Sequence, residues 1–391
     1  MAAPEPPPLS HAHHTAPPHI RAIHKTYQKL PVPALAHDRH ILDLAAAAAD
    51  TPARQWHAPH LKLVGYVPGE RARGAFSAFR GAAGCGDDDE EEAAGGGGRG
   101  GAAIYEHDFV PGLQIIPSLL PPRTQRTLLS ALLHKHLSNP EHATNLHPHY
   151  TLPYPSSPSS SDIKTASSVG GSFFTLPPTT PLPPLSPTHT PLTTHRMLSK
   201  KLRWLTLGAQ YDWTLKQYPA GSSSVSFPAD VGGLITDLLP KTTTPQAAIT
   251  NLYSPGDTLA PHRDVSEASR APLVSVSVGC DAVFVIGLDP ATDSPPVPSS
   301  PDSPDSSAPP PRNPDADSSA EAGERVLVLR VHSGDVVVMG GASRWAWHSV
   351  PRVVAGSCPG YVAGWPGAGM GEWAGWMGGK RVNLNVRQMW D

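Results

Sequence analysis

The chain has 391 residues, of which 47 are proline and 35 are glycine, and only 39% are hydrophobic. These values indicate long segments that cannot bury enough apolar surface to offset the entropy of ordering them, so we expect one globular domain with disordered insertions. A formal net charge of −3 excludes a general attraction to nucleic acid, which would instead need a local basic patch.

The three cysteines lie far apart in the sequence, and this excludes a disulfide framework or a cysteine-based zinc site and fits a reducing compartment. No apolar run approaches the length of about 18 residues that a transmembrane helix needs. The N-terminus lacks the charged start and apolar stretch of a secretory signal. We therefore expect an intracellular monomer in the nucleus, the cytoplasm or both, with no membrane partner and with a mitochondrial location left open.

The first part of the chain predicts little packed structure. Residues 1–104 are expected to be largely disordered with short helices, because residues 1–20 are rich in proline and histidine and residues 81–101 are acidic and glycine-rich. Order is expected to resume at Phe109, with a strand over 110–116 and then a helix that opens at Pro121. Residues 139–195 are rich in Ser, Thr and Pro and are predicted to be a disordered insertion.

From Arg196 onward the pattern is that of a β-rich domain. β-Branched runs bounded by Gly, Pro and Asp predict strands over 204–207, 248–253, 273–278, 282–287, 326–331, 336–339 and 382–386, with one helix over 231–239. A second insertion, 290–324, separates two of these strands. Residues 105–391 therefore predict a mainly β (α+β) domain, with a jelly-roll or cupin-like double-stranded β-helix as its core.

His262 and Asp264, followed far downstream by His348, predict a metal site. On a strand, a spacing of two places both side chains on one face, so that both can reach one ion. Two histidines and one carboxylate form the facial triad that holds Fe(II) and leaves coordination positions open for a co-substrate and dioxygen. The pattern is weak by itself in a chain with 20 histidines, and its neighbours give it weight.

A polar row near the C-terminus predicts a pocket for an anionic co-substrate. In the run from Arg381 to Arg387 the residues Arg381, Asn383, Asn385 and Arg387 alternate with Val382, Leu384 and Val386, so a strand would present all four polar groups on one side. Arginine is suited to a keto acid with a second carboxylate, because its planar fork binds carboxylate through two hydrogen bonds. An ordinary half-exposed edge strand would show the same alternation.

Together these stretches resemble the AlkB family of Fe(II)/2-oxoglutarate dioxygenases, and most closely its homologue 1 branch. The matching segments are LRWLTLGAQYDW, FPADVGGL, NLYSPGDTLAPHRDVSE, PLVSVSVGCDAVFVIG, LRVHSGDVVVMGGASRWAWHSVPRV and RVNLNVRQ. The resemblance is weak over 105–135 and strong over 196–391 apart from the insertion.

The resemblance implies roles for individual residues. His262, Asp264 and His348 would bind Fe(II) and form the catalytic centre, and 2-oxoglutarate would be held by Asn251, Tyr253, Arg381, Asn383 and Arg387. Arg381 and Tyr253 would hold its distal carboxylate, with Arg387 and Asn251 nearer the metal-chelating end. Trp204 and Tyr211 match positions that contact the flipped base and its phosphate.

The implied activity is oxidative removal of N-methyl groups from nucleic-acid bases, with O2 consumed and succinate, CO2 and formaldehyde released. Single-stranded or loop substrates would be favoured, because the target base must leave its stack. Trp204 and Tyr211 could stack on a base. A basic cluster just before Trp204, consisting of Arg196, Lys200, Lys201 and Arg203, could follow the phosphate backbone, although such a cluster can also be a solvated charged surface.

The substrate base is left open by the sequence. In the bacterial AlkB pattern an acidic residue two positions after the metal-binding aspartate helps to select the base, and here that position is Ser266. Methylated adenine in tRNA, mRNA or DNA is the expected target class. Two alternatives stay open: a 2-oxoglutarate oxygenase that acts on protein, and a non-catalytic scaffold, which the intact set of ligand residues disfavours.

Overall fold

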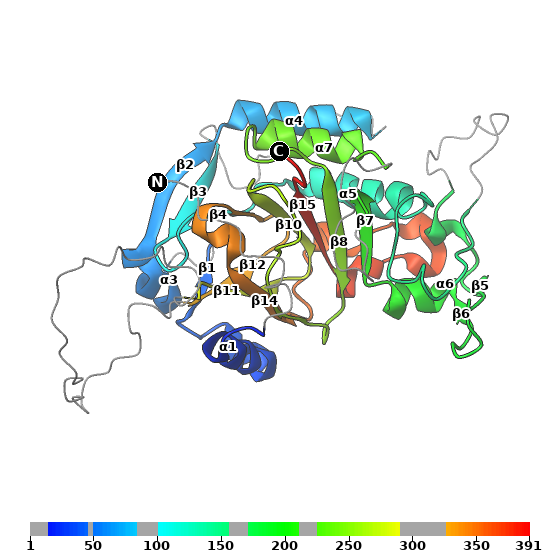
Figure 1. Ribbon diagram of the computed structural model, residues 1–391, viewed down its shortest axis with the longest axis horizontal. Helices are drawn as coiled ribbons and strands as arrows, with labels where there is room; N and C mark the ends of the chain where they lie inside the picture. Colours follow the sequence, from blue (N-terminus) through cyan, green and yellow to red (C-terminus); the bar gives the residue numbers. More distant parts are fainter. Residues whose placement is uncertain (1–14, 46–49, 84–100, 156–170, 211–224, 290–325) are drawn as a thin grey trace, which may run out of the picture.

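Two β-sheets packed face to face form the centre of the structure, a computed structural model that describes residues 15–45, 50–83, 101–155, 171–210, 225–289 and 326–391 (Figure 1). The larger sheet has the order β2 (Leu61–Val67), β3 (Ala102–His107), β4 (Leu113–Ile116), β13 (Val336–Met339), β10 (Leu273–Gly279), β15 (Arg381–Arg387), β8 (Ala247–Tyr253) and β7 (Trp204–Gly208). The smaller sheet has the order β1 (Ile41–Asp43), β12 (Val326–Val331), β11 (Ala282–Gly287), β14 (Trp347–Val353) and β9 (Leu259–His262).

Alternation along the strands decides which face each residue occupies. In β10 and β15 one set of side chains, Val274, Val276, Val278, Val382, Leu384 and Val386, is buried in the main hydrophobic core. The intervening Ser275, Arg381, Asn383, Asn385 and Arg387 line a cavity on the opposite face of the sheet. A strand pattern of period two therefore separates a packed face from a polar, cavity-lining face.

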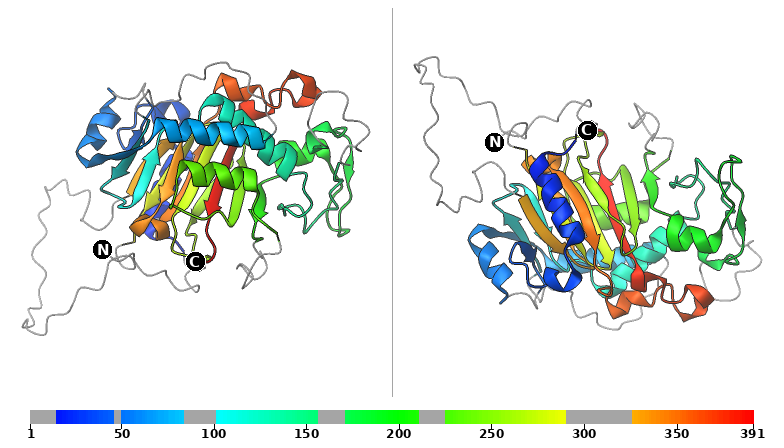
Figure 2. Two further views of the ribbon diagram at one scale, coloured as in Figure 1. Left: turned by 90° about the horizontal axis from the view of Figure 1, so that it is seen from above. Right: turned by 90° about the horizontal axis from the view of Figure 1, so that it is seen from below.

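Helices cover the outer faces of the two sheets. The larger sheet is covered by α4 (Gly69–Ala82), α5 (Pro122–Ser130), its π-helical continuation η4 (Ala131–His136) and α7 (Ala229–Leu238) (Figure 2). Across the smaller sheet lies α1 (Pro18–Lys29), where the His24 Nδ1 and Ser349 Oγ atoms are 3.0 Å apart. Among the described residues, no helix combines the length and apolarity that crossing a bilayer would require.

The remaining elements are short. They are α2 (Val32–Leu35), α3 (Pro52–His57), η3 (Ala58–His60), η5 (Phe173–Thr175), α6 (Thr194–Arg196), η6 (Met197–Lys201), η7 (Gly341–Trp345), α9 (Gly360–Ala363), η8 (Ala368–Trp373), η9 (Trp376–Gly379) and the strand pair β5 (Pro181–Leu182) and β6 (Leu192–Thr193).

The double-stranded β-helix core predicted from the sequence is confirmed, with each predicted strand from 204 onward present within two residues of its expected bounds. The short pair β5 and β6 was not predicted, and neither were five strands of the two packed sheets, β1, β2, β3, β9 and β14. Two of these five contain proline, Pro261 in β9 and Pro351 in β14, and a proline within a run argues against a strand when only the sequence is known. β9 lies at the edge of its sheet, where proline is tolerated.

The predicted disorder of 139–195 does not hold for residues 139–155 and 171–195. Phe173 and Phe174 are fully buried in the main core, and the Asn145 Oδ1 atom accepts a hydrogen bond of 2.7 Å from the Arg203 backbone N–H. Two buried aromatic side chains are enough to anchor this segment to the core, although its average composition predicts no packed structure. Residues 156–170 and the whole of the second insertion, 290–324, lie outside the described residues.

The N-terminal region is also more ordered than expected where it is described. β1 pairs in parallel with β12 of the smaller sheet, and β2 pairs with β3 of the larger one. α4 buries Phe76 and Phe79 in the main core. The low apolar content of the region as a whole hides these local patterns, and residues 1–14, 46–49 and 84–100 are not among those described.

Candidate active site

His262, Asp264 and His348 converge at the end of the smaller sheet. His262 of β9 is the register partner of His348 on β14, and Asp264 follows just after β9. Each side chain offers one ligand atom, and these three atoms lie within 4.8 Å of one another. The His348 Nε2 and Asp264 Oδ2 atoms are 3.8 Å apart. The three residues could therefore bind a single metal ion.

Backbone hydrogen bonds orient both imidazole rings. The Nδ1 atom of His262 lies 2.9 Å from the Ala260 carbonyl oxygen, and that of His348 lies 3.1 Å from the Ala346 carbonyl oxygen. Since a carbonyl can only accept, each Nδ1 carries the proton and donates it. Each Nε2 then has its lone pair available for a metal, as is usual when a backbone carbonyl fixes the tautomer of a ligating histidine.

The electrostatics of the three groups suit a divalent cation. Burial, reinforced by the neighbouring His262, lowers the pKa of His348 to about 4, so its ring is neutral near pH 7. Burial by itself would raise the pKa of Asp264, but the positive charge of the neighbouring Arg387 outweighs burial and holds this pKa below its usual value. A neutral imidazole and an ionised carboxylate are the protonation states that bind metal.

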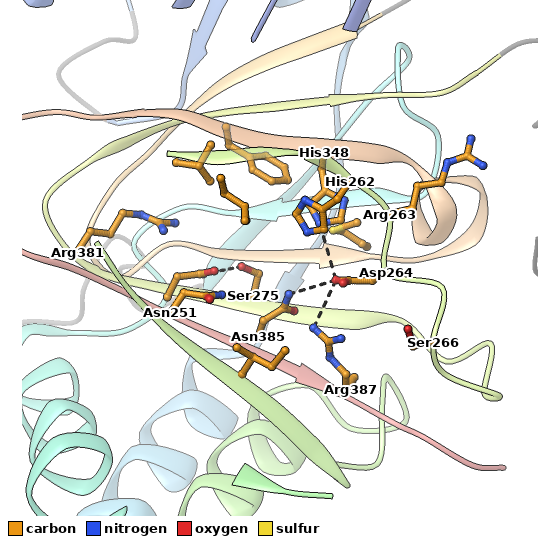
Figure 3. A pocket seen from close by; sticks show the side chains of 16 residues that line it. Asn251, His262, Arg263, Asp264, Ser266, Ser275, His348, Arg381, Asn385 and Arg387 are labelled. Carbon is orange, nitrogen blue, oxygen red and sulfur yellow. Dashed lines mark hydrogen bonds and ion pairs between the residues drawn. The ribbon is translucent and has the colours of Figure 1, made fainter. Parts of the chain in front are cut away.

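A cavity of about 260 Å³ extends from these three residues between the two sheets. Figure 3 shows the triad toward one end and Arg381 at the other, with its guanidinium directed into the cavity. The apolar part of the wall is formed by Ile249, Leu259, Phe284, Met339 and Val350, and the polar part includes Asn251, Ser266, Ser275, Asn383, Asn385 and Arg387.

Arg381 and Tyr253 are buried with unsatisfied polar groups. Arg381 is 3% exposed and donates through one terminal nitrogen to Ser277 Oγ at 3.0 Å, but its Nε and its other terminal nitrogen have no hydrogen-bond partner. The Tyr253 hydroxyl also has none, and burial raises its pKa to about 12, so it stays protonated. Since burying an unpaired cation is costly, this end of the cavity is built to receive an anion.

The rest of β15 connects Arg381 with the triad. The Arg387 guanidinium and the Asn385 amide each lie 3.4 Å from Asp264 Oδ2. The Asn383 amide donates to Ser275 Oγ at 2.8 Å and to the Val276 carbonyl at 3.1 Å, which fixes the wall between the two ends. β15 therefore runs along the cavity from the Arg381 end to the triad.

A family profile described as "2OG-FeII_Oxy_2: 2OG-Fe(II) oxygenase superfamily" matches residues 177–387, which include every residue of this site. The chain belongs to the 2OG-Fe(II) oxygenase superfamily. It is therefore a 2-oxoglutarate-dependent dioxygenase, with Fe(II) as its cofactor and 2-oxoglutarate and O2 as its co-substrates.

Relatives place this dioxygenase in the AlkB homologue 1 group. It is 40% identical over 293 residues to the "N6-methyladenosine RNA demethylase ALKB1" of Pyricularia oryzae, covering 74% of this chain and 77% of the relative. The "N6-methyladenosine RNA demethylase ALKBH" of Cryphonectria parasitica is 43% identical over 63% of this chain and 100% of its own length. The "tRNA demethylase abh1" of Schizosaccharomyces pombe is 35% identical over 73% of this chain and 82% of its own length.

The cavity of this oxygenase fits its cofactor and co-substrate. Two imidazole nitrogens and one carboxylate on a single face are the ligands of a non-haem Fe(II) site. The unsatisfied guanidinium of Arg381 at the far end matches a carboxylate, with which it could form a bidentate ion pair. Tyr253 does not line the cavity, but its ring centroid lies 5.4 Å from that guanidinium.

Of the two residues expected to contact the substrate base, only Trp204 lies among the described residues. Trp204 lies on β7, the edge strand of the larger sheet, and its register partner is Asn251 of β8. Because residues paired across two strands share a face, Trp204 is on the cavity side of the sheet, although it does not line the cavity itself. Tyr211 lies outside the described residues.

The basic cluster before Trp204 is exposed, as a nucleic-acid contact requires. Arg196, Lys200, Lys201 and Arg203 all lie at the surface, and Arg203 forms an ion pair with Asp257. Among the described residues, Arg196, Lys200 and Lys201 form no ion pair with a carboxylate and could contact phosphates.

Ser275 and Phe284 belong to the cavity but were not predicted, whereas Asn385 was predicted only as a member of the polar row of β15 and without a role of its own. Asn385 had a signal, because it alternates with the apolar residues of β15 and so shares the face of Arg381 and Arg387. Ser275 and Phe284 had none, since a serine and a phenylalanine within valine-rich strands are ordinary in sequence and only the packing of the two sheets brings them to the wall.

Proposed function

We propose that this dioxygenase removes N-methyl groups from nucleic-acid bases, with methylated adenine in RNA such as tRNA or mRNA, or in DNA, as the target class. The reaction would release formaldehyde, succinate and CO2. The observation that carries the proposal is the convergence of three metal-ligand atoms within 4.8 Å at one end of a cavity whose other end holds an unpaired arginine. Three relatives that are named as RNA or tRNA demethylases support the substrate class.

In this proposal His262, Asp264 and His348 hold Fe(II) through two Nε2 atoms and one carboxylate. When bound, Fe(II) and 2-oxoglutarate supply the oxidising chemistry with O2. Arg381 and Tyr253 bind the distal carboxylate of 2-oxoglutarate, which neutralises the buried guanidinium. We assign Arg387 and Asn251 to the metal-chelating end, and Asn383, the register partner of Asn251, braces the strand between the two ends.

The apolar wall and the edge strand have separate roles in the proposal. Leu259, Phe284 and Val350 exclude water from the cavity, which strengthens the electrostatic contacts of the co-substrate. Trp204, on the cavity side of the sheet edge, stacks on the extruded base together with Tyr211, and the exposed basic cluster holds the flanking phosphates. Ser266 lines the cavity without offering a charge to the base.

The test is formaldehyde release across a panel of methylated oligonucleotides, comprising tRNA stem-loops, unstructured mRNA-like RNA and single-stranded DNA, with His262→Ala as the inactive control. Turnover above that control with at least one methyladenine substrate is the expected result. Turnover with none of them, in a protein that still decarboxylates 2-oxoglutarate, would overturn the proposal and direct the search to protein substrates.

We also propose that residues 105–391 carry the catalytic centre, with β1, β2 and β3 completing its two sheets, and that the enzyme is an intracellular monomer of the nucleus, the cytoplasm or both. Light scattering of the purified chain would test the monomer, since a dimer doubles the measured mass. The position of a fluorescent fusion at either terminus would test the compartment.

A further inference from the structure

A buried carboxylate, Glu267, bridges two buried arginines beside the triad. Its Oε1 atom lies 2.6 Å from a terminal nitrogen of Arg387, and its Oε2 atom lies 3.1 Å from a terminal nitrogen of Arg344. The exposed fractions of the three side chains are 0% for Glu267, 1% for Arg344 and 4% for Arg387. Neither Glu267 nor Arg344 lines the cavity, so neither is placed to touch 2-oxoglutarate.

Arg344 joins the two segments that carry the metal ligands. It lies in η7, just before His348, and its other nitrogens reach into the segment between β9 and β10. One donates to the backbone carbonyl of Asp264 at 2.8 Å, and Nε donates to the carbonyl of Ala271 at 3.0 Å. The guanidinium is also 4.2 Å from the ring centroid of Trp345. One planar group thus holds the irregular segment of Asp264 against the strand of His348.

Glu267 in turn decides where Arg387 lies. Arg387 is bonded at 2.6 Å to Glu267 but is 3.4 Å from Asp264, so the shorter contact is with Glu267. Without Glu267, two buried guanidinium groups would face one remaining carboxylate, that of Asp264. Arg387 would then move onto the metal-binding oxygen, because burying an uncompensated charge costs several kcal/mol.

We propose that Glu267 and Arg344 are positioning residues of the iron site, with Arg344 fixing the backbone of Asp264 and Glu267 restraining Arg387 so that the Asp264 carboxylate stays available to the metal. This inference rests on the proposed assignment of His262, Asp264 and His348 as the metal ligands. Groups that orient metal ligands from outside the coordination sphere are typically worth 10- to 100-fold in metal affinity or activity.

The test uses the full-length protein with Glu267→Gln, which keeps the size of the side chain and removes its charge. Calorimetry measures the Kd for Mn(II), used as a redox-inert probe, and then the Kd for 2-oxoglutarate in the presence of Mn(II). Steady-state kinetics give KM for 2-oxoglutarate and for the oligonucleotide. We expect both Kd values to rise about 10- to 100-fold, with KM for the oligonucleotide unchanged within about twofold.

Two further variants separate the roles of the pair. Arg344→Lys keeps the charge but loses the fork to the Asp264 and Ala271 carbonyls, so it should weaken Mn(II) binding more than 2-oxoglutarate binding. Glu267→Asp keeps the charge on a shorter side chain and should recover part of the affinity that Glu267→Gln loses. Glu70→Gln, at an exposed position of α4 beyond the larger sheet, is the matched control and should leave both Kd values unchanged.

The outcomes distinguish this inference from the proposed function. If the unmodified protein binds no Mn(II), the proposed metal site itself is wrong. If it binds Mn(II) and 2-oxoglutarate, and Glu267→Gln lowers Tm while both Kd values stay as in the unmodified protein, the pair serves folding alone and the inference is overturned. Should Glu267→Gln fail to fold, the Kd values of Arg344→Lys and Glu267→Asp decide by the same criterion.

Discussion

At the scale of single residues, the two arginines of β15 have opposite surroundings. Arg387 forms an ion pair with Glu267 through a terminal nitrogen at 2.6 Å, whereas Arg381 keeps two buried nitrogens without a hydrogen-bond partner. In the proposed function these identical side chains on one face of one strand therefore have different roles: Arg387 is restrained beside the proposed metal ligands, and Arg381 binds a carboxylate.

Replacing Arg381 with lysine should impair 2-oxoglutarate binding specifically. Lysine keeps the positive charge but offers a single point contact in place of the bidentate fork, so KM for 2-oxoglutarate should rise about 10- to 100-fold, the equivalent of one strong hydrogen bond to a charged group. Steady-state decarboxylation assays measure this. Arg21→Lys, at an exposed position of α1, is the control, and an equal KM for Arg381→Lys and the control would contradict the assignment.

At the scale of elements, α1 supports the strand that carries a metal-ligand residue. Ile20 is fully buried and packs against Trp347, the neighbour of His348 on β14. His24 of the same helix approaches Ser349 on the other side of His348. A helix in the N-terminal region, where the sequence suggested little packing, thus backs the metal-binding strand.

Truncation of Ile20 to alanine should lower the free energy of unfolding by about 2–5 kcal/mol, because a large apolar side chain leaves a cavity that the neighbouring residues cannot fill. Urea denaturation followed by circular dichroism measures the change. Arg21→Ala, one position along the same helix but exposed, should change stability by less than about 0.5 kcal/mol. Similar effects of both substitutions would mean that α1 does not pack as described.

β1 is fixed to the smaller sheet by a charged cluster around His332. The two ring nitrogens of His332 lie 2.9 Å from Asp43 and 3.1 Å from Asp281, and Asp281 also pairs with Arg330 at 2.7 Å. Burial opposes protonation, but the two carboxylate hydrogen bonds outweigh it and raise the pKa of His332 to about 10. Asp335, whose pKa burial raises to about 6, faces the same ring.

This cluster predicts a stability that falls at alkaline pH. The pKa of His332 is higher in the folded chain than in the unfolded one, so its stabilisation is complete below about pH 6.5 and is lost as the pH rises toward about 10. Tm measured from pH 7 to 10 should decline more steeply for the unmodified protein than for His332→Gln. Parallel profiles for the two proteins would show that His332 is not protonated in the fold.

At the scale of the whole molecule, the strands on either side of the second insertion, β11 and β12, pair with each other in the smaller sheet. Gly287 at the end of β11 and Val326 at the start of β12 are register partners, so the ends of the insertion are neighbours in the sheet. A short hairpin turn could join them with no change in the strands.

Replacing residues 290–325 with a short glycine-containing turn should therefore preserve the fold and 2-oxoglutarate binding. Closing a shorter loop costs less entropy, and each halving of loop length contributes about 0.6 kcal/mol, so Tm should stay equal or rise slightly. Differential scanning calorimetry, together with 2-oxoglutarate-dependent Mn(II) titration, checks both outcomes. A fall of Tm would show that the insertion packs against the core.

The sequence predicted the fold and the chemistry well because both depend on local patterns. Alternation of period two gave the strands of the core, and the short spacing of His262 and Asp264 gave half of the metal site. It failed at β14, where Pro351 argued against a strand, and at Phe173 and Phe174, because the tryptophans that pack against Phe174 lie far along the chain.

The sequence by itself determined which residues could do iron and 2-oxoglutarate chemistry, since the residue types and their spacing limit the possible ligands. Only the tertiary structure decided how they are held. Glu267, Arg344 and Arg387 come from three different segments, and of these only Arg387 stood out in the sequence, as a member of the polar row near the C-terminus. They form one buried network because the two sheets pack together. Once buried, each charged group needs a partner of opposite charge, because an unpaired buried charge destabilises the fold.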